Sequence, residues 1–319
     1  MIIAIDTGNK QFKTKNYTYI SGLNESSMKS ALTSDVLEFQ GLYYTLSDSR
    51  IKYTREKFTD ENFFILTLFG IGKEILKAYP NPGNETRSIT LLLGLPLAHY
   101  SQYEKFEEFY KRGIVEFTYR GYHMKIRIDF VMTFVQGYAA ILTDENAKYL
   151  KEKKLLLMDI GGFTADAINI INGIVKTDDS QTMEMGVIPF YNKVREEINA
   201  SFDLLLSEDD IDEIILHDNH LNLDDDVMFE NIKRIIDAMA QNHIAEIIRQ
   251  LRENGIDLRT YLTVFIGGGS LLLKSYILDF KEKRRTIGRA EFIDNINANV
   301  LGYEKMYRDY QKLQKIKKK

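Results

Sequence analysis

The stretch Leu157-Met158-Asp159-Ile160-Gly161-Gly162-Phe163-Thr164-Ala165-Asp166 decides the fold class of this chain. It reads as a buried strand that ends in an aspartate, then a glycine turn and a second apolar run. A shorter copy, Ile3-Ala4-Ile5-Asp6-Thr7-Gly8, stands near the start of the sequence, about half the chain earlier. Two copies of one strand-to-turn signature indicate a duplicated α/β unit, and we expect its halves to face each other across a cleft.

Further apolar runs define the expected strands. Runs of this length that are rich in Ile, Val and Leu are typical of strands buried on both faces, as in α/β proteins. They cover residues 2–5, 89–95, 155–158, 167–171 and 262–266. The charged stretch 148–154 places a domain boundary near residue 150, with a first domain over 1–150 and a second over 151–299.

Helices are expected between the strands. The clearest covers 227–254, where apolar residues recur at three- and four-residue spacing, and Gly255 is its expected terminating residue. Ser207 and Asp210 predict a capping box for a helix that runs to Leu216, and 59–79 predicts another helix. A stripe near the end of the chain is interpreted as core packing: Tyr303, Tyr307, Tyr310 and Leu313.

Composition excludes several classes of protein. The chain has 319 residues, of which 44% are hydrophobic and 28% charged, as in an ordinary soluble protein, and this length predicts about two domains. The absence of cysteine excludes a disulfide framework, a thiolate zinc site and a cysteine nucleophile. With a net charge of -4, the chain lacks the broad positive field that nonspecific binding to duplex DNA needs, so no direct nucleic-acid contact is expected.

No membrane span and no secretion signal are expected. The longest apolar candidate, 89–98, is interrupted by Thr90, Gly94 and Pro96. The N-terminal segment has no basic residues before its apolar run. Together with the lack of cysteine, these features predict a cytoplasmic protein.

An aspartate at the end of a buried strand, followed by a glycine turn, places a carboxylate beside backbone N–H groups. The N–H groups can hold phosphate oxygens, and the carboxylate can hold hydrated magnesium. If Asp6 and Asp159 meet at ~4 Å, their repulsion is about 4 kcal/mol at an effective dielectric of about 20, and a divalent cation removes it. We therefore expect two phosphate clamps around one metal-bound polyphosphate. The alternative is a pair of ordinary strand-ending turns.

A third glycine motif, Thr263-Val264-Phe265-Ile266-Gly267-Gly268-Gly269-Ser270, leads from an apolar strand into an expected helix over 271–280. Three residues without side chains allow a flat ligand to approach the backbone closely. A flexible turn is the alternative. No glycine stands three residues after Gly269, so this is not a Rossmann fingerprint, and the chain contains no Gly-x-x-x-x-Gly-Lys-Ser/Thr phosphate loop.

The motifs that start at Asp6, Asp159 and Gly267 have the order and spacing of the phosphate and adenosine motifs of the actin, sugar-kinase and heat-shock chaperone superfamily. Residues 134–140, Phe-Val-Gln-Gly-Tyr-Ala-Ala, resemble its first connecting helix. Within this superfamily, the chain is most similar to the ParM (StbA) group of bacterial actin-like plasmid-segregation proteins. Two segments resemble motifs of that group: Gly94-Leu95-Pro96-Leu97 and 297–303, Asn-Ala-Asn-Val-Leu-Gly-Tyr. The resemblance implies an α/β actin-like fold: two duplicated RNase H-like domains around a nucleotide cleft, with a C-terminal helix, about 300–319, joining the first domain.

The resemblance also implies roles for matching residues. Asp6 and Asp159 would hold Mg2+ through water, and Gln136 would position the attacking water; because a glutamine cannot take its proton, slow hydrolysis is expected. Ser270 is expected near the ribose or base. The residues expected to contact ATP or GTP are Thr7, Gly8, Asn9, Lys10, Gly161, Gly162, Phe163, Thr164, Gly267, Gly268, Gly269 and Ser270. No role is given to Lys193, Arg195 and Glu197, on the helix expected after Gly186.

The resemblance implies a nucleotide-hydrolysing protein that polymerises into dynamic filaments and segregates plasmid DNA through a ParR-like, DNA-bound adaptor. The acidic balance agrees with the need for an adaptor. The alternatives are a small-molecule kinase, a chaperone-type ATPase and a nonhydrolysing scaffold. A kinase needs a second carboxylate near Gln136, and a chaperone needs a further peptide-binding domain. The presence of Asp6, Gln136 and Asp159 argues against the scaffold.

Two charged features receive structural interpretations. His217 and His220, followed by aspartates at 224–226, lack a third metal ligand at suitable spacing, so we expect a solvated loop whose last aspartate caps a helix at Val227. The lysine-rich end, 312–319, is either a basic contact for an acidic partner or a frayed helix end whose cations complement the macrodipole. We favour the second interpretation of this end.

Overall fold

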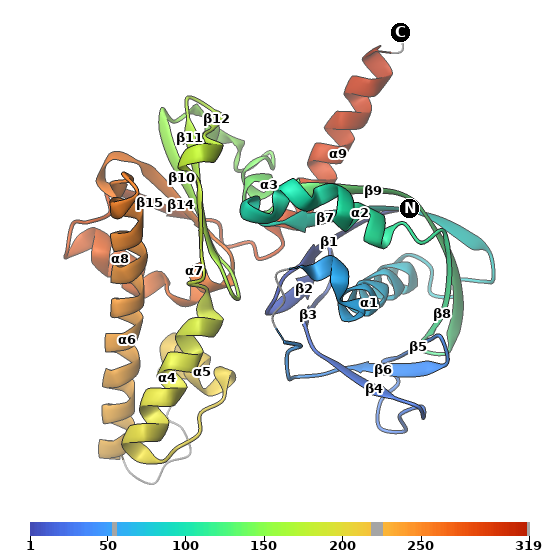
Figure 1. Ribbon diagram of the computed structural model, residues 1–319, viewed down its shortest axis with the longest axis horizontal. Coiled ribbons are helices and arrows are strands. Elements are labelled where there is room, and N and C mark those ends of the chain that lie inside the picture. Colours follow the sequence, from blue (N-terminus) through green and yellow to red (C-terminus); the bar gives the residue numbers. More distant parts are fainter. Residues whose placement is uncertain (53–55, 218–225, 318–319) are drawn as a thin grey trace. The chain divides into compact units, whose positions relative to one another are not determined.

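The computed structural model describes residues 1–52, 56–217 and 226–317, and the chain divides into two compact units (Figure 1). Unit 1 comprises Met1–Ala147 and Asn297–Lys319, and unit 2 comprises Lys148–Ile296. Each unit has a mixed α/β structure with its own sheet and its own hydrophobic core, which confirms the predicted α/β class. The division falls close to the boundary predicted near residue 150.

Unit 1 is built on a nine-stranded sheet in the order β3-β2-β1-β7-β9-β8-β5-β6-β4. β1, β7 and β9 are parallel neighbours, so their carboxyl ends meet at one edge of the sheet. β1 also forms an antiparallel hairpin with β2, in which Thr7 lies opposite Phe12. The strands are β1 (Ile2–Thr7), β2 (Gln11–Lys13), β3 (Thr18–Ile20), β4 (Leu23–Ser26), β5 (Val36–Phe39), β6 (Leu42–Leu46), β7 (Thr86–Leu95), β8 (Ile114–Tyr119) and β9 (Tyr122–Val135).

Helices cover both faces of this sheet, and the alternation of side chains along β1 shows which face each residue takes. Ile3 and Ile5 belong to the core that includes α1, whereas Ala4 packs with Val300 of α9. Asp6 continues the series of Ala4, so the alternation directs its carboxylate toward the face that α9 covers. The helices of unit 1 are α1 (Glu61–Ala78), α2 (Tyr103–Tyr110), α3 (Tyr138–Ile141) and α9 (Ala298–Lys317).

The core stripe predicted on the last helix is correct for its first half and wrong for its second. Tyr303 and Tyr307 are buried, but Tyr310 is 39% exposed and Leu313 is 59% exposed. Tyr307 still packs against Phe130 of β9, with ring centroids 5.9 Å apart. The remaining turns of α9 extend past the sheet of unit 1 (Figure 1), so no core is left for the later residues of the stripe.

Unit 2 contains a six-stranded sheet in the order β12-β11-β10-β14-β15, and β13 also pairs with β11. β10 and β14 are parallel, with Asp159 in register with Ile266. The strands are β10 (Lys154–Ile160), β11 (Ala165–Ile171), β12 (Ile174–Val175), β13 (Gln181–Met183), β14 (Leu262–Ile266) and β15 (Arg289–Phe292). The helices are α4 (Val187–Phe202), α5 (Glu208–His217), α6 (Asp226–Glu253), α7 (Gly268–Leu272) and α8 (Lys274–Glu282).

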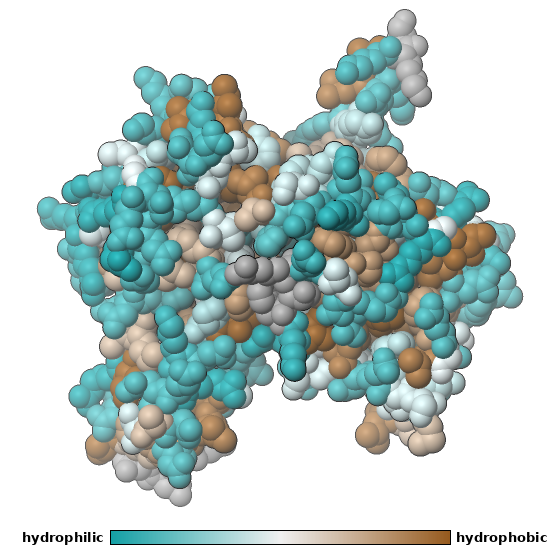
Figure 2. All heavy atoms as spheres, viewed as in Figure 1, coloured by the Kyte–Doolittle hydropathy of each residue, from teal (hydrophilic) through white to brown (hydrophobic). Residues whose placement is uncertain are grey.

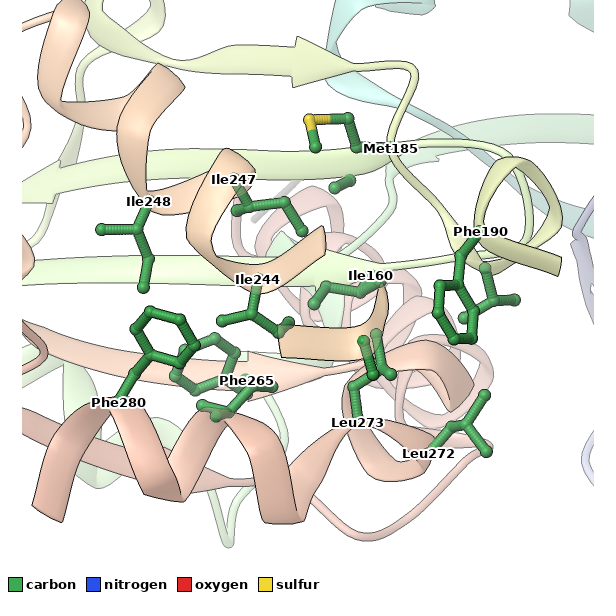
Figure 3. Packing of buried hydrophobic residues seen from close by; sticks show 14 of the residues in the cluster. Ile160, Met185, Phe190, Ile244, Ile247, Ile248, Phe265, Leu272, Leu273 and Phe280 are labelled. Atoms are coloured by element: carbon green, nitrogen blue, oxygen red, sulfur yellow. The ribbon is translucent and has the colours of Figure 1, made fainter. Parts of the chain in front are cut away.

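The core of unit 2 lies between its sheet and the long helix α6. Ile244 and Ile248 of α6 point toward Phe265 of β14 and Phe280 of α8, and Ile247 lies on the side of Met185 (Figure 3). This contact explains the three- and four-residue spacing seen in the sequence, because it places one face of the helix against apolar neighbours.

The predicted helix ends are mostly confirmed. α6 ends at Glu253, and Gly255 follows with a positive φ of 83°. Ser207 and Asp210 form the expected capping box: the Asp210 N–H donates to Ser207 Oγ at 3.1 Å, and the Ser207 N–H donates to Asp210 Oδ2 at 2.7 Å.

Two expectations for helices of unit 2 differ from the structure. The helix expected over 271–280 is divided at Leu273 into α7 and α8. Asp226 is the first residue of α6, one position before the helix start expected at Val227. His220, Asp224 and Asp225 lie outside the described residues. Among the helices that the structure describes, none has the length and apolar character needed to cross a bilayer.

A histidine lies inside the core of unit 2. His243 of α6 is buried, its ring is 5.5 Å from that of Phe190, and its Nε2 lies 3.0 Å from the carbonyl oxygen of Met185. Burial is the main cause that lowers the pKa of His243 from 6.5 to about 4, and nearby Lys193 adds to it; the Met185 carbonyl and Glu246 act in the opposite direction.

Acid should therefore destabilise unit 2 through His243. Because the folded pKa lies below the unfolded value, the unfolded chain binds the proton first, so stability is full above about pH 6.5 and falls as the pH drops toward about 4. The full loss in the free energy of unfolding is about 3 kcal/mol, which corresponds to the pKa shift of His243 from 6.5 to about 4. Chemical denaturation of wild type and His243→Gln between pH 7.5 and 4 measures it: the wild type should lose more stability than the variant. Parallel losses would contradict the assignment.

Candidate functional site

The hairpin between β1 and β2 forms the first part of the candidate site. Ser21 fixes its backbone: the Ser21 hydroxyl donates to the Gly8 carbonyl at 2.7 Å, and the Ser21 N–H donates to the Lys10 carbonyl at 3.0 Å. Gly8 lies so close to the Gln11 carbonyl that a side chain would collide with it. The sequence from Thr7 to Lys10 thus makes a tight, rigid turn at the carboxyl edge of the sheet.

Asp6 is joined to Gln136 at this edge. Asp6 is 7% exposed, and its Oδ1 accepts a hydrogen bond from Gln136 Nε2 at 2.5 Å. The Gln136 N–H in turn donates to the Leu95 carbonyl at the end of β7, at 2.9 Å. The structure therefore brings together two residues predicted to act in catalysis. Gln136 lies in the turn before α3 rather than on a connecting helix, because only Tyr138–Ile141 is helical.

Asn299 completes this network, and no role was predicted for it from the sequence. Its Nδ2 donates to Asp6 Oδ2 at 3.3 Å, and its Oδ1 accepts from the Gly137 N–H at 2.8 Å. Gly137 has a positive φ of 76°, a conformation that suits glycine and turns the chain sharply after Gln136. Asn299 thus holds the Asp6 carboxylate and the turn that carries Gln136. The only sequence signal was its place in the segment 297–303.

Two buried polar atoms in the first hairpin have no hydrogen-bond partner among the described residues: Thr7 Oγ1 and Asn9 Oδ1. A buried polar group without a partner costs about 1–3 kcal/mol, so natural structures rarely retain one without a reason. The Thr7 hydroxyl can donate to a phosphate oxygen, and Asn9 Oδ1 can accept from a water of a hydrated cation. This donor set fits the nucleotide and the Mg2+ expected from the sequence.

Lys57 adds a buried positive charge beside the same hairpin. It lies in a short 3-10 helix, Lys57–Thr59, and its Nζ donates to the carbonyl of Thr7. The side chain also lies over the ring of Phe63, 5.4 Å from the centroid. A buried ammonium here favours an anion at the hairpin. No motif in the sequence marks Lys57, because its hydrogen bond to Thr7 spans 50 positions.

The hairpin between β10 and β11 forms the corresponding part of unit 2. The carbonyls of Gly161, Gly162 and Phe163 accept hydrogen bonds from the backbone N–H groups of Val187, Ile188 and Gly186 at 3.1, 2.7 and 2.9 Å. In a trans peptide the N–H points opposite to the carbonyl. The N–H groups of residues 162–164 therefore point away from α4, on one side of the turn, where they could hold an anion.

Asp166 fixes this second hairpin. Its carboxylate is buried and accepts hydrogen bonds from Thr164 Oγ1 at 2.9 Å and from Thr182 Oγ1 on β13. The Thr164 hydroxyl is thus engaged within unit 2, so a contact of Thr164 with a ligand would use its backbone. Asp166 was part of the motif in the sequence, but its supporting function was not predicted.

The three-glycine motif begins next to Asp159, as the register of β10 and β14 requires. Gly267 has a positive φ of 86°, and Asp159 Oδ1 and the Ile160 carbonyl occupy the space where a side chain would lie. Gly269 is enclosed by Ile160 and Val187, whose atoms lie 2.7 Å from where a β-carbon would stand, whereas Gly268 faces open space. Packing within unit 2 thus accounts for two of the three glycines, and Gly268 is the one that a ligand can approach.

Ser270 follows the three glycines, and its side chain points into unit 2. Its side chain is completely buried, and its hydroxyl lies 3.5 Å from the carbonyl oxygen of Met158 on β10. The hydroxyl thus faces the core, so a contact of Ser270 with a ribose or base, which stays a prediction, would use its backbone. Lys193, Arg195 and Glu197 lie exposed on α4, and the structure gives them no further role.

The metal assignment combines both units. Asp6 belongs to unit 1 and Asp159 to unit 2, so a shared hydrated cation stays a prediction. Among the described residues, no three or more His, Asp or Glu side chains cluster as they would around a directly ligated metal. Magnesium often keeps several waters and uses one or two carboxylates, so the predicted mode of binding needs no such cluster.

Comparison with known proteins adds information on the fold. The family model described as archaeal actin homologue MreB-like, C-terminal, matches residues 157–279, within unit 2. A ParM from a 15-stranded filament of Clostridium botulinum is 19% identical, with a TM-score of 0.73 over 97% of this chain and 99% of that chain. The actin-like protein Alp7A is 13% identical, with a TM-score of 0.75 over 100% and 99%.

An archaeal actin homologue in complex with ADP is also similar: it is 17% identical, with a TM-score of 0.73 over 97% of this chain and 99% of that chain. No curated protein matches the sequence. The chain therefore has the actin-like fold over nearly its whole length, and its predicted resemblance to ParM and other actin homologues is confirmed.

Proposed function

We propose that this protein is an actin-like ATPase or GTPase that polymerises into dynamic filaments and segregates plasmid DNA. The observation that carries the proposal is the network of Asp6, Gln136 and Asn299 beside a rigid hairpin with unpartnered polar atoms. In this network a carboxylate suited to a hydrated cation and an amide suited to a water lie within one hydrogen bond of each other. An actin-like neighbour with bound ADP supports nucleotide as the ligand.

Hydrolysis would depend on how Gln136 is held. Its Nε2 is engaged by Asp6, which leaves Oε1 as the side-chain atom able to accept a hydrogen bond from the attacking water. That water would attack the γ-phosphorus while the bond to the β,γ-bridging oxygen breaks, giving the diphosphate and inorganic phosphate. Since a glutamine orders water but does not remove its proton, the reaction would be slow.

Asp6 and Asp159 would hold Mg2+ through water, and the ion would neutralise charge on the phosphates. The backbone N–H groups of the two hairpins would orient the phosphate chain, and the surface over Gly268 would receive the nucleoside.

The filament and its cargo are further parts of the proposal. Similar chains include a ParM filament and an Alp12 filament, which supports self-assembly. With a net charge of -4, the chain would reach plasmid DNA through a ParR-like adaptor rather than directly. A filament that reaches plasmid DNA through an adaptor would act in the cytoplasm, where the DNA is.

Assembly is the first test. With Mg2+ and ATP or GTP the purified protein should sediment as polymer above a critical concentration, and electron microscopy should show filaments, because closing the site with nucleotide selects the assembling conformation. The same sample with EDTA is the control. Sugar-dependent release of ADP without polymer would support a small-molecule kinase instead, and polymer without phosphate release would indicate a nonhydrolysing scaffold.

Gln136→Ala should slow phosphate release roughly 10- to 100-fold while nucleotide affinity stays within about threefold, because the variant loses the group that orders water but keeps both hairpins. Filaments of this variant should last longer. A phosphate-release assay and light scattering measure the two effects. Gln102→Ala, on a glutamine outside the network, is the matched control, and unchanged phosphate release in Gln136→Ala would remove the role assigned to this residue.

The glycines give a separate test of nucleoside binding. Gly268→Ala adds a methyl group on the open side of the motif, so nucleotide affinity should fall roughly tenfold without a lower melting temperature. Gly269→Ala places the methyl group against Ile160 and Val187 and should cost roughly 1–3 kcal/mol of stability. Calorimetric titration with ADP and thermal denaturation distinguish the two. Wild-type affinity in Gly268→Ala would place the nucleoside elsewhere.

A further inference from the structure

The projecting end of α9 exposes apolar side chains at helical spacing. Leu313 and Ile316 are 59% and 68% exposed, and Tyr310 lies one turn before Leu313. Residues three or four apart are neighbours on a helix surface, so these side chains form one apolar strip along the end of α9. Figure 2 shows hydrophobic and hydrophilic residues side by side on this projecting end. An apolar strip that leaves its own core is typical of a contact with another molecule.

The same end of α9 is strongly basic. Residues 310–319 include five lysines and no acidic residue. Lys312 pairs with Asp309 at 3.2 Å, but Lys315 and Lys317 have no ion-pair partner within the part of the chain that the structure describes. Two or three cations would already complement the helix dipole, and that role would not require the exposed apolar strip. The pattern therefore favours an acidic, partly apolar partner over the frayed end expected from the sequence.

Unit 2 carries a surface of complementary character. Helix α5 has five acidic residues in the six positions 208–213, among which Asp209 and Glu213 are exposed. α5 packs on α6, and α6 packs on α8, and a groove of about 560 Å³ lies among the three helices. Ile215 and Leu216 of α5 supply apolar lining, and Leu216 is half exposed. We call this groove and the acidic face of α5 the α5 groove.

The charges of the α5 groove favour a basic occupant. Asp237 and Asp279 line it together with Lys233 and Lys283, and Lys283 is paired with Asp279 at 2.5 Å. The charges of the lining itself thus balance, and the acidic residues of α5 give the surface its excess negative charge. A helix with an apolar strip and flanking lysines matches this combination of apolar lining and acidic border.

We propose that the end of α9, residues 310–317, docks into the α5 groove of a second copy of this chain. The inference rests on the proposed filament function and names its contact surfaces. An open-ended filament requires two different, complementary surfaces on every copy, because a surface that pairs with itself closes after two subunits. The chain carries such a pair: a basic apolar helix end on unit 1 and an acidic apolar groove on unit 2.

Charge reversal tests the pairing. A tail variant with Lys312→Glu, Lys315→Glu and Lys317→Glu should raise the critical concentration for assembly roughly tenfold or more, and a groove variant with Asp209→Lys and Glu213→Lys should do the same. A control with three exposed lysines reversed elsewhere in unit 1 should assemble like wild type: Lys29→Glu, Lys77→Glu and Lys105→Glu.

A mixture of the two variants provides the sharper measurement. In a mixture, the acidic tail of one variant meets the basic groove of the other, and the unchanged tail meets the unchanged groove. Each variant alone should fail to sediment at the wild-type critical concentration, whereas an equal mixture should sediment again. If the tail contacts the groove of its own copy, mixing will not restore assembly. A mixture that fails to sediment would therefore overturn the proposal.

Crosslinking examines the contact without requiring filaments or hydrolysis. Because the chain has no cysteine, a Leu313→Cys copy and a Leu216→Cys copy each carry one thiol. A short bismaleimide should join them into a heterodimer several-fold more efficiently than it joins Leu313→Cys to Leu32→Cys, whose position is 98% exposed in unit 1. Equal yields would overturn the proposal, even for a protein that assembles normally.

The outcomes separate this inference from the proposed function. Wild type that never assembles with nucleotide contradicts the filament, while a selective crosslink still supports the contact. Wild type that assembles together with both charge variants supports the filament and overturns the contact. Flotation with vesicles containing phosphatidylglycerol, abolished in the tail variant but without a selective crosslink, would assign the tail to an anionic membrane instead and also overturn the proposal.

Discussion

The candidate site of unit 1 depends on how the carboxylate of Asp6 is held. Its two oxygens accept hydrogen bonds from Gln136 and Asn299, so one side chain joins the end of β1, the turn before α3 and the first turn of α9. Amide donors satisfy a buried carboxylate without neutralising it, whereas a lysine or arginine would form an ion pair. The negative charge therefore remains available to a hydrated cation, and the same contact fixes the glutamine proposed to order water.

Local sequence patterns could predict five of the strands (β1, β7, β10, β11 and β14), the turns after Asp6 and Asp159 and the capping box, because each is encoded within a few neighbouring residues. Asn299 could not be recognised in this way. It meets Asp6 across 293 positions, and only the alternation of β1 together with the packing of α9 brings them into contact. The orientation of Ser270 could not be predicted either, because a hydroxyl after a glycine turn suits both a ligand and a backbone carbonyl, and in the structure it lies beside the carbonyl of Met158.

The three-glycine motif shows how a sequence signal can combine structural and functional requirements. Gly267 makes room for Asp159 and the Ile160 carbonyl, and Gly269 allows α7 to approach Ile160 and Val187. Both glycines would be needed in this fold even without a ligand, because the parallel pairing of β10 and β14 forces the close approach. The case for a nucleoside at this motif therefore depends on Gly268, whose surroundings impose no such requirement.

Helix α9 links the candidate site to the surface proposed for assembly. Its second residue, Asn299, contacts Asp6, and its last turns extend past the sheet with an exposed basic and apolar surface. A docked tail would restrain the helix whose start holds Asp6 and Gly137, and a bound nucleotide would restrain the same helix from its other end. A coupling free energy between two binding events acts equally in both directions. If nucleotide favours docking of the tail, docking must strengthen nucleotide binding by the same factor, and removal of the γ-phosphate would weaken both together.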